Sequence, residues 1–216
     1  MPPLTASDLK RRHRAVRDGQ EDNASTRLHR AISWLARSEQ EADDVDARFM
    51  FQWVALNAAY AREFSAEDNE RTRFRQFVAT LVELDGERLL HAALFRQFSG
   101  PIRTLIGNRF VFEPFWIALR DHDSSDRWKT RFSESQGVAM DAIVRGDTAK
   151  VLSIVFDRLY VLRNQLVHGG ATWNSQVNRD QLRDGAAILG TLLPLCLSVM
   201  LDHPGQDFGE VLYPVV

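Results

Sequence analysis

The sequence is short of several residue types on which whole functional classes depend. Cys196 is the single cysteine among 216 residues, so no disulfide framework or cysteine-rich metal site can form within one chain. Lysine is scarce too: Lys10, Lys129 and Lys150 are the three lysines among 27 basic residues, and the formal net charge is -2. This balance disfavours a protein that coats nucleic acid through bulk positive charge, but it leaves room for a local basic site.

Signals for export and for membrane insertion are also missing. Residues 1–19 contain no apolar run of signal-peptide length, and Pro194 interrupts the most apolar segment, 186–201. No glycine-rich phosphate loop or Cys-His pair stands out. We therefore expect a cytoplasmic protein without a membrane span, and we expect neither a metal nor a cofactor.

Helical periodicity dominates what is present, and no run of alternating apolar and polar residues indicates a strand. The sequence predicts helices at 27–37 (capped by Ser25 or Thr26), 46–64, 67–84, 86–98 (ended by Gly100-Pro101), 148–168 (capped by Asp147 or Thr148) and 179–201 (capped by Asn178). Short helices and loops are expected over 101–137. The predicted organisation is a polar, partly helical or flexible segment 1–24, followed by one all-α domain over 25–216.

The helix predicted at 148–168 has a clear core face. Its apolar residues recur at helical spacing, and they are Val151, Val155, Leu159, Leu162 and Leu166. Arg163 falls at the edge of that face, whereas Asn164 and His168 fall on the opposite side. The far side also carries Ile154, Tyr160, Val161 and Val167. Because this is more apolar than a solvated face should be, we expect a second packing surface, from another helix or another subunit.

Arg163, Asn164 and His168 together offer the groups that RNA cleavage needs. A histidine can move protons to and from the 2'-hydroxyl and the leaving 5'-oxygen, and an arginine can stabilise charge on the phosphorus in the transition state. His168 is expected in the last helical turn, where the negative end of the helix dipole favours a positive charge. Asn164 can donate to a phosphate oxygen or orient the histidine.

Spacing alone does not distinguish this group from chance. Arginine accounts for 24 of the 27 basic residues and histidine for 6 residues, so roughly 0.7 arginine-histidine pairs are expected at any fixed separation. Requiring an asparagine directly after the arginine lowers the expectation to about 0.02. The position at the glycine-terminated end of a long helix makes the pattern more specific still.

The stretch RLYVLRNQLVHGG resembles the signature of the HEPN superfamily, most closely its Apea-like and related bacterial groups. That signature is an arginine, usually followed by a polar residue such as asparagine, and then a histidine after four to six intervening residues. Arg163, Asn164 and His168 match it with four residues between arginine and histidine. The stretch FQWVALNAAY around Trp53 and Asn57 is similar to the tryptophan-containing early helix of such proteins.

The resemblance implies an all-α helical bundle that forms a homodimer through the region of the motif helix, with both motif copies in one cleft. It implies a metal-independent endoribonuclease that leaves 2',3'-cyclic phosphate ends, with Arg163 and His168 as catalytic residues and Asn164 in support. Such proteins often serve as toxins or defence effectors with an antitoxin or other defence partner. Gly170 stands where some members carry a tyrosine that an antitoxin modifies, so regulation at that position is not expected.

Three alternatives stay open. A non-catalytic HEPN module that binds RNA or a partner protein would carry the same motif, and in a purely structural bundle Arg163 would pair with a carboxylate such as Asp157 or Asp184. Asn57 can reach a cleft to position substrate or His168, but it can equally bond a neighbouring helix. The stretch DHDSSD around His122 superficially resembles a metal motif, and we interpret it as a polar loop.

Overall fold

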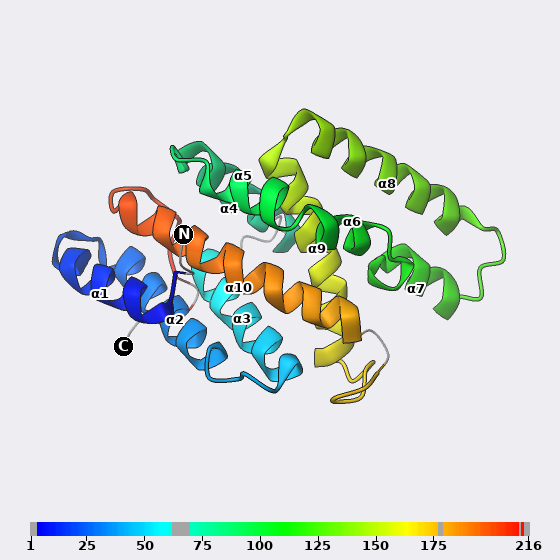
Figure 1. Cartoon of the computed structure of the whole chain (residues 1–216), viewed down its shortest axis with the longest axis horizontal. Coiled ribbons are helices and arrows are strands. Elements are labelled where there is room, and N and C mark those ends of the chain that lie inside the picture. Colours follow the sequence, from blue (N-terminus) through cyan, green and yellow to red (C-terminus); the bar gives the residue numbers. More distant parts are fainter. Residues whose placement is uncertain (1–3, 62–69, 177–178, 212, 214–216) are drawn as a thin grey trace. The chain divides into compact units, whose positions relative to one another are not determined.

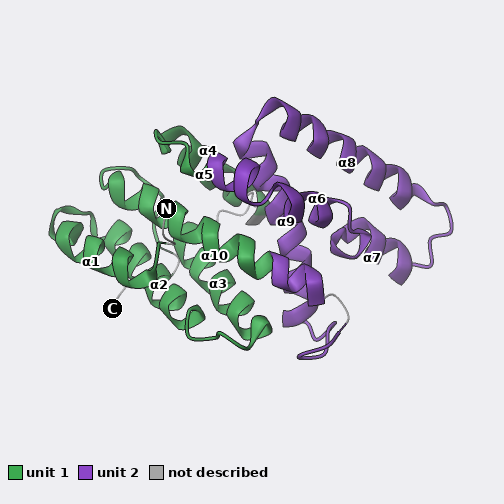
Figure 2. Cartoon of the chain, viewed as in Figure 1, with its two compact units in different colours: residues 1–90, 185–216 green, residues 91–184 purple. Residues whose placement is uncertain are grey.

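The structure is a computed structural model that describes residues 4–61, 70–176, 179–211 and 213. Within these ranges it contains ten α-helices, α1 to α10, with short 3-10 and π-helical segments and no β-strand (Figure 1). The predicted all-α class is confirmed. The chain divides into two compact units, of which unit 1 comprises Met1–Leu90 and Gly185–Val216, and unit 2 comprises His91–Asp184 (Figure 2). The predicted division at residue 25 stays a prediction.

Unit 1 contains α1 (Ala6–Val16), α2 (Asp22–Ser38), α3 (Val45–Tyr60), α4 (Glu70–Leu84) and most of α10 (Arg179–Asp202). The most extensive packing in it joins α2 to α3, which a short loop connects as an antiparallel pair (Figure 1). The buried residues of α2 follow the helical period and include Leu28, Ala31, Ile32 and Leu35. The α3 helix buries residues on several sides, which confirms that it is a central helix.

Arg27 of α2 is a buried cation that links α2 to the end of α3 and to the C-terminal segment. Its Nη1 donates to the carbonyl oxygens of Ala59, at 3.0 Å, and Ala61, at 2.6 Å, which lie where α3 ends. Its Nη2 donates to the carbonyl oxygens of Gly209, at 2.9 Å, and Glu210, at 3.3 Å. One guanidinium therefore satisfies carbonyl groups that a helix terminus leaves open and also ties down the C-terminal segment.

The α10 helix packs closely against α3 in unit 1. A Cβ added at Gly190 would lie 2.9 Å from Nε2 of Gln52, so a larger residue at this position would require the Gln52 side chain to move. In the part of the chain that the structure describes, α10 is also the one helix with the length and hydropathy of a membrane span. However, 72% of its most apolar window is buried inside the structure, and buried core helices can have the same length and hydropathy.

Unit 2 consists of a π-helical turn at Ala93–Gln97, α6 (Ser99–Ile106), a 3-10 turn at Arg109–Val111, α7 (Glu113–Arg120), α8 (Arg127–Arg145) and α9 (Thr148–Val167). The α9 helix contacts α6, α8, the π-helical turn and the 3-10 turn. Asp147 caps α9 through a bond from the Lys150 backbone N–H to its Oδ1, at 2.9 Å, which confirms Asp147 as the predicted cap. The α5 helix (Leu89–Ala92) spans the boundary between the units.

Arg158 joins α8 to α9 in the interior of unit 2. Its Nη2 donates to Oγ of Ser135 at 3.0 Å, and its guanidinium lies 4.5 Å from the ring centre of Phe112 and 5.7 Å from that of Phe132. Burial lowers the pKa of Arg158 to about 10. The two rings offset part of the cost of burying this charge, because an aromatic face attracts a cation.

Several predicted boundaries are wrong. The helix predicted from residue 27 begins at Asp22 after the cap residue Glu21, and Ser25 instead contacts Nε2 of His13 through Oγ, at 3.1 Å. The stretch predicted to end at residue 98 does end there, since Phe98 caps the π-helical turn, but Gly100 and Pro101 lie in the first turn of the next helix, α6, where proline removes a donor that would have no partner in the helix anyway. Residues 62–64, 67–69 and Asn178 of the predicted helices and cap lie outside the described residues.

The short helices and loops predicted over 101–137 are confirmed as far as residue 126, where α6, the 3-10 turn and α7 lie, but they are wrong from Arg127, where the long helix α8 begins. This helix buries only the small residues Ala139 and Ala142, while Val138, Met140 and Val144 are exposed. Its apolar pattern is therefore a poor guide to the face that packs. The stretch DHDSSD is a loop between α7 and α8, as predicted.

Candidate functional site

The predicted motif occupies the C-terminal end of α9 in unit 2 (Figure 1). The helix ends at Val167, His168 is the C-cap residue, and Gly169 follows with a φ of 68°. The His168 N–H donates to the Asn164 carbonyl at 3.0 Å, and the Ala171 N–H donates to the Gln165 carbonyl at 3.0 Å. The left-handed glycine and these closing bonds confirm the predicted stop signal.

Arg163 and Asn164 are joined side chain to side chain. Nη1 of Arg163 donates to Oδ1 of Asn164 at 2.9 Å, and the guanidinium carbon lies 5.7 Å from the ring centre of Tyr160. All three residues are partly exposed. The amide oxygen and the ring restrict the rotamers of the arginine, so its charge is held at the surface of α9 instead of moving freely in solvent.

His168 is exposed, and its ring has no hydrogen-bond or ion-pair partner among the residues that the structure describes. Tyr160, Asn164 and His168 follow one another at four-residue steps, which places them on one stripe of α9. Arg163 lies beside this stripe, one residue before Asn164, and its guanidinium reaches the stripe through the bond to Asn164. A substrate phosphate approaching this stripe would meet a held guanidinium and an accessible imidazole. Of the four predicted site residues, the structure therefore joins Arg163 to Asn164 and places His168 one turn after Asn164 on the same helix.

The apolar far side of α9, for which a second packing surface was expected from another helix or another subunit, is covered in part. Val161 is buried, and Ile154 and Tyr160 are half-buried. The last turn differs, since Val167 beside His168 is 46% exposed. Leu166, predicted to be core, is only partly buried, because the helix ends there and fewer neighbours surround it.

The two carboxylates considered as partners of Arg163 lie in different surroundings. Asp184 interacts with Asp180 and Arg183, and its pKa is raised by burial first and by Asp180 second. Asp157 lies on α9 next to Arg158, whose charge it favours. One partner of Arg163 is the neutral side chain of Asn164, which accepts from Nη1, and the pairing of Arg163 with a carboxylate stays an open alternative.

Asn57, the fourth predicted site residue, belongs to α3 in unit 1, whereas the motif belongs to unit 2. Its Oδ1 is buried and has no hydrogen-bond partner among the described residues. The alternative that Asn57 bonds a neighbouring helix is therefore not what the described structure shows. Its supporting role at the site stays a prediction.

Sequence reasoning missed a feature next to the motif, a cavity of about 460 Å³ beside the 3-10 turn of unit 2. It is lined by Thr104, Gly107, Asn108, Arg109, Phe110, Phe132 and Gln181. Nε2 of Gln165 on α9 donates to the Phe110 carbonyl at 2.7 Å, which ties the cavity to the motif helix. The signal in the sequence was the adjacent pair Arg109-Phe110, which no periodicity argument uses.

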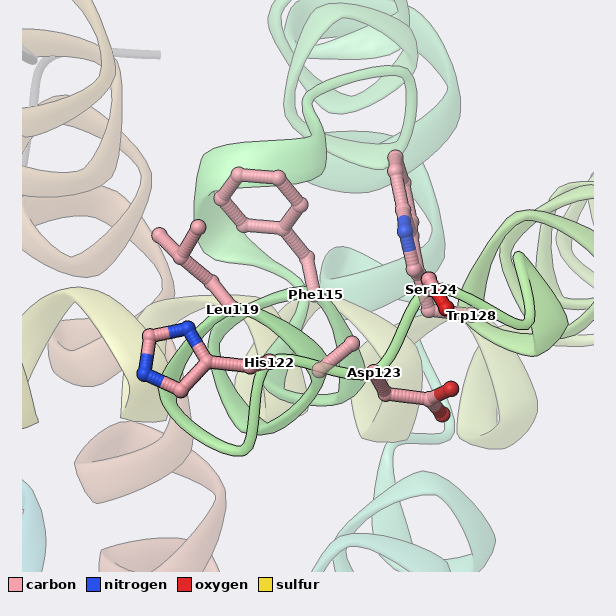
Figure 3. A pocket seen from close by; sticks show the side chains of 7 residues that line it. Phe115, Leu119, His122, Asp123, Ser124 and Trp128 are labelled. Carbon is pink, nitrogen blue, oxygen red and sulfur yellow. The ribbon is translucent and has the colours of Figure 1, made fainter.

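A second cavity, of about 290 Å³, lies at the loop between α7 and α8 (Figure 3). Its lining is mostly apolar, with Phe115, Leu119 and Trp128 facing it, and it also includes His122 and Asp123. The His122 ring and the Asp123 carboxylate point in different directions (Figure 3). Asp123 instead bonds the Ser125 N–H at 2.8 Å and lies near Arg127. We find no acid-base pair in this cavity.

The other chemically reactive groups are poor candidates for catalysis. Burial raises the pKa of the Cys196 thiol to about 12, so the thiolate that would act as a nucleophile is disfavoured. Among the described residues no group of three or more histidine, cysteine, aspartate or glutamate side chains could hold a metal ion. The end of α9 is therefore the strongest candidate site among the described residues.

Comparisons with protein-family models, with curated proteins and with solved structures found no match to this chain.

Proposed function

We propose that the chain is a metal-independent endoribonuclease of the HEPN type that cleaves RNA with Arg163 and His168. The observation that carries the proposal is the end of α9, where an accessible His168 lies one turn after Asn164, whose Oδ1 holds the Arg163 guanidinium through a 2.9 Å bond. The resemblance of RNQLVHGG to the HEPN signature supports the same assignment.

The proposed reaction uses the substrate's own 2'-hydroxyl. A base removes the 2'-hydroxyl proton, the 2'-oxygen attacks phosphorus, and the bond from phosphorus to the 5'-oxygen breaks as an acid protonates that oxygen. The products are a 2',3'-cyclic phosphate and a 5'-hydroxyl. Arg163 stabilises the negative charge that develops on the phosphoryl oxygens, and Asn164 holds the guanidinium in place.

One chain supplies one motif histidine, whereas the reaction needs a base and an acid. A homodimer that brings two copies of the α9 end together would supply both, and each copy would cover the other's exposed apolar surface. Val167, which is 46% exposed beside His168, is the apolar residue that such a partner would cover. We propose that the protein acts in the cytoplasm as a toxin or antiphage-defence effector, with an antitoxin or another defence component as partner.

A non-catalytic HEPN module that binds RNA or a partner protein is the second candidate. The observation that favours it is the His168 ring, which no side chain among the described residues orients. A catalytic base is usually oriented by a third group. In the endoribonuclease that group would come from the second copy or from the substrate.

The test is an RNA cleavage assay in EDTA. Purified wild type, His168→Ala and Arg163→Ala are incubated with total RNA after circular dichroism has shown that each variant is folded. Cleavage by the wild type with at least a hundredfold loss in both variants supports the endoribonuclease. Equal cleavage by the variants, or no cleavage by any of the three while RNA still binds, contradicts it, and the latter result favours the binding module.

A further inference from the structure

The cavity beside the 3-10 turn of unit 2 has the size and chemistry of a ligand site. Its volume of about 460 Å³ falls within the range of roughly 300–1,000 Å³ that is usual for small-molecule sites. Residues from α6, the 3-10 turn, α8 and the first turn of α10 line it. The lining includes an aromatic surface, one cation and neutral polar side chains, but no carboxylate. This chemistry disfavours a metal ion or a cationic ligand.

Arg109 and Phe110 form a stacked pair at the edge of this cavity. The Arg109 guanidinium carbon lies 5.0 Å from the ring centre of Phe110 and 5.5 Å from that of Phe115. No carboxylate lies within ion-pair distance of Arg109 in the described part of the chain. The Phe110 side chain is 37% exposed, so the pair offers an open ring face and a guanidinium whose charge no acidic group neutralises.

Phe110 is held firmly although it is exposed. Its backbone carbonyl accepts from Nε1 of Trp116 at 2.8 Å and from Nε2 of Gln165 at 2.7 Å. Its backbone N–H donates to Oδ1 of Asn108 at 2.8 Å. With its backbone fixed on both sides, the ring is positioned before a ligand arrives, which lowers the entropy cost of binding.

The bond to Gln165 places the cavity next to the proposed catalytic residues. Gln165 follows Asn164 directly and precedes His168 by three positions, so Gln165 and His168 are neighbours on the surface of α9. Side chains with this spacing have Cβ atoms about 5–6 Å apart. A nucleotide whose phosphate lay at His168 would therefore have the Phe110 ring within reach of a neighbouring base.

We propose that this cavity binds a nucleobase of single-stranded RNA, with the base stacked on Phe110 and with Arg109 binding the base or the adjacent phosphate. This inference rests on the proposed function. Aromatic rings and arginine planes are the usual platforms for unstacked bases, and they favour single strands because a base in a duplex is already stacked. The amide NH₂ of Asn108, whose Oδ1 already accepts from Phe110, and Gln181 supply hydrogen bonds to the base edge.

The test measures binding of a fluorescein-labelled single-stranded RNA in EDTA by anisotropy, with the full chain carrying His168→Ala so that the RNA stays intact. Phe110→Leu keeps apolar bulk and the backbone bonds but removes the stacking surface, and we expect affinity to fall roughly five- to tenfold. Phe110→Tyr retains an aromatic face and should bind within twofold of the parent. Arg109→Gln should weaken binding about threefold to fivefold.

Arg145→Gln is the matched control for charge, because Arg145 is exposed and already paired with Asp141 at 2.9 Å. It should bind within twofold of the parent. Equal binding by folded Phe110→Leu and the parent, in a protein whose wild type cleaves RNA in EDTA, overturns the nucleobase site alone. Absence of both RNA binding and cleavage in the wild type overturns the proposed function, and the nucleobase site with it.

Discussion

Nη1 of Arg163 donates a hydrogen bond of 2.9 Å to Oδ1 of Asn164, the next residue along α9. This contact gives the asparagine after the arginine a physical role in the motif, because Asn164 binds the arginine side chain directly. The amide oxygen accepts from the guanidinium, and this restricts the positions that the positive charge can take. In the proposed reaction Asn164 is thus a positioning residue that acts through Arg163.

Asn164→Ala should lower the rate of RNA cleavage about tenfold, which is the usual order for losing one hydrogen bond to a charged group. The guanidinium is still present in this variant, but it has lost the bond that orients it. We therefore expect kcat to fall while KM changes less than twofold. Asn164→Asp keeps an acceptor oxygen and should recover part of the rate. Steady-state kinetics on a short RNA checks this, and wild-type kcat in Asn164→Ala would remove Asn164 from the mechanism.

Gly169→Ala should destabilise the protein by about 1 kcal/mol, because Gly169 has a φ of 68° that other residues adopt at a cost. A Cβ at Gly169 would meet nothing within 4 Å, so the cost is conformational and not steric. Gly137→Ala is the matched control, since Gly137 lies inside α8 with equally open space, and it should stabilise by about 0.5–1 kcal/mol. Urea unfolding measures the free energy of unfolding of both variants. If the two substitutions changed it in the same direction, the role given to the left-handed Gly169 would be contradicted.

Asp147→Ala should lower the free energy of unfolding by about 1 kcal/mol, because it removes the side chain that accepts from the Lys150 N–H at the start of α9. Cleavage measured well below the melting temperature should stay within twofold of wild type. Denaturant unfolding beside the activity assay checks both parts. A large loss of activity in a protein that remains folded would mean that the start of α9 contributes directly to the site.

The variant Asn57→Leu tests whether Asn57 supports the site or has no role in it. The buried Oδ1 of Asn57 has no partner among the described residues, and an unsatisfied buried acceptor costs about 1–3 kcal/mol. We therefore expect the free energy of unfolding to rise by about 1 kcal/mol. If Asn57 supports the site, the same variant loses RNA cleavage; unchanged cleavage in a more stable protein would contradict that role.

Acidification should destabilise the protein in part through His13. Burial, followed by the nearby His29 and Arg17, lowers the pKa of His13 below its ordinary value of 6.5. The unfolded chain then binds the proton more readily than the folded one, so the free energy of unfolding falls as the pH drops below about 6.5. His13→Gln should flatten this dependence, whereas His122→Gln at an exposed position should not. Urea titrations at pH 7.5 and 5.5 give the free energy of unfolding of wild type and of both variants. The same change in this free energy with pH in all three proteins would contradict a contribution from His13.

The fold class and the motif helix were predictable because each depends on local pattern. Val151, Val155, Leu159 and Leu162 recur at helical spacing and are buried, Asp147 caps α9, and Gly169 ends it. The start of α2 was not predictable from capping residues, because Ser25 contacts His13 instead of capping a helix. A tertiary contact of this kind leaves no local signature.

The site was predictable only in part, for the same reason. The shared face of Asn164 and His168 follows from the geometry of any α-helix, whereas the bond from Arg163 to Asn164 depends on the side-chain rotamers. The cavity at Arg109 and Phe110 depends on a bond from Gln165 to a residue far away along the chain, and the burial of Arg27 depends on carbonyl groups of α3 and of the C-terminal segment. Such long-range partners have no fixed spacing in a sequence.

The chemistry of the RNA ends tests the central claim most directly. A defined single-stranded RNA is cleaved in EDTA by wild type and by folded His168→Ala, and the new 3' ends are identified by mass spectrometry. The account predicts 2',3'-cyclic phosphate ends with wild type and at least a hundredfold fewer with His168→Ala. New 3'-hydroxyl ends, or cyclic phosphate ends formed equally fast by both proteins, would contradict cleavage by His168.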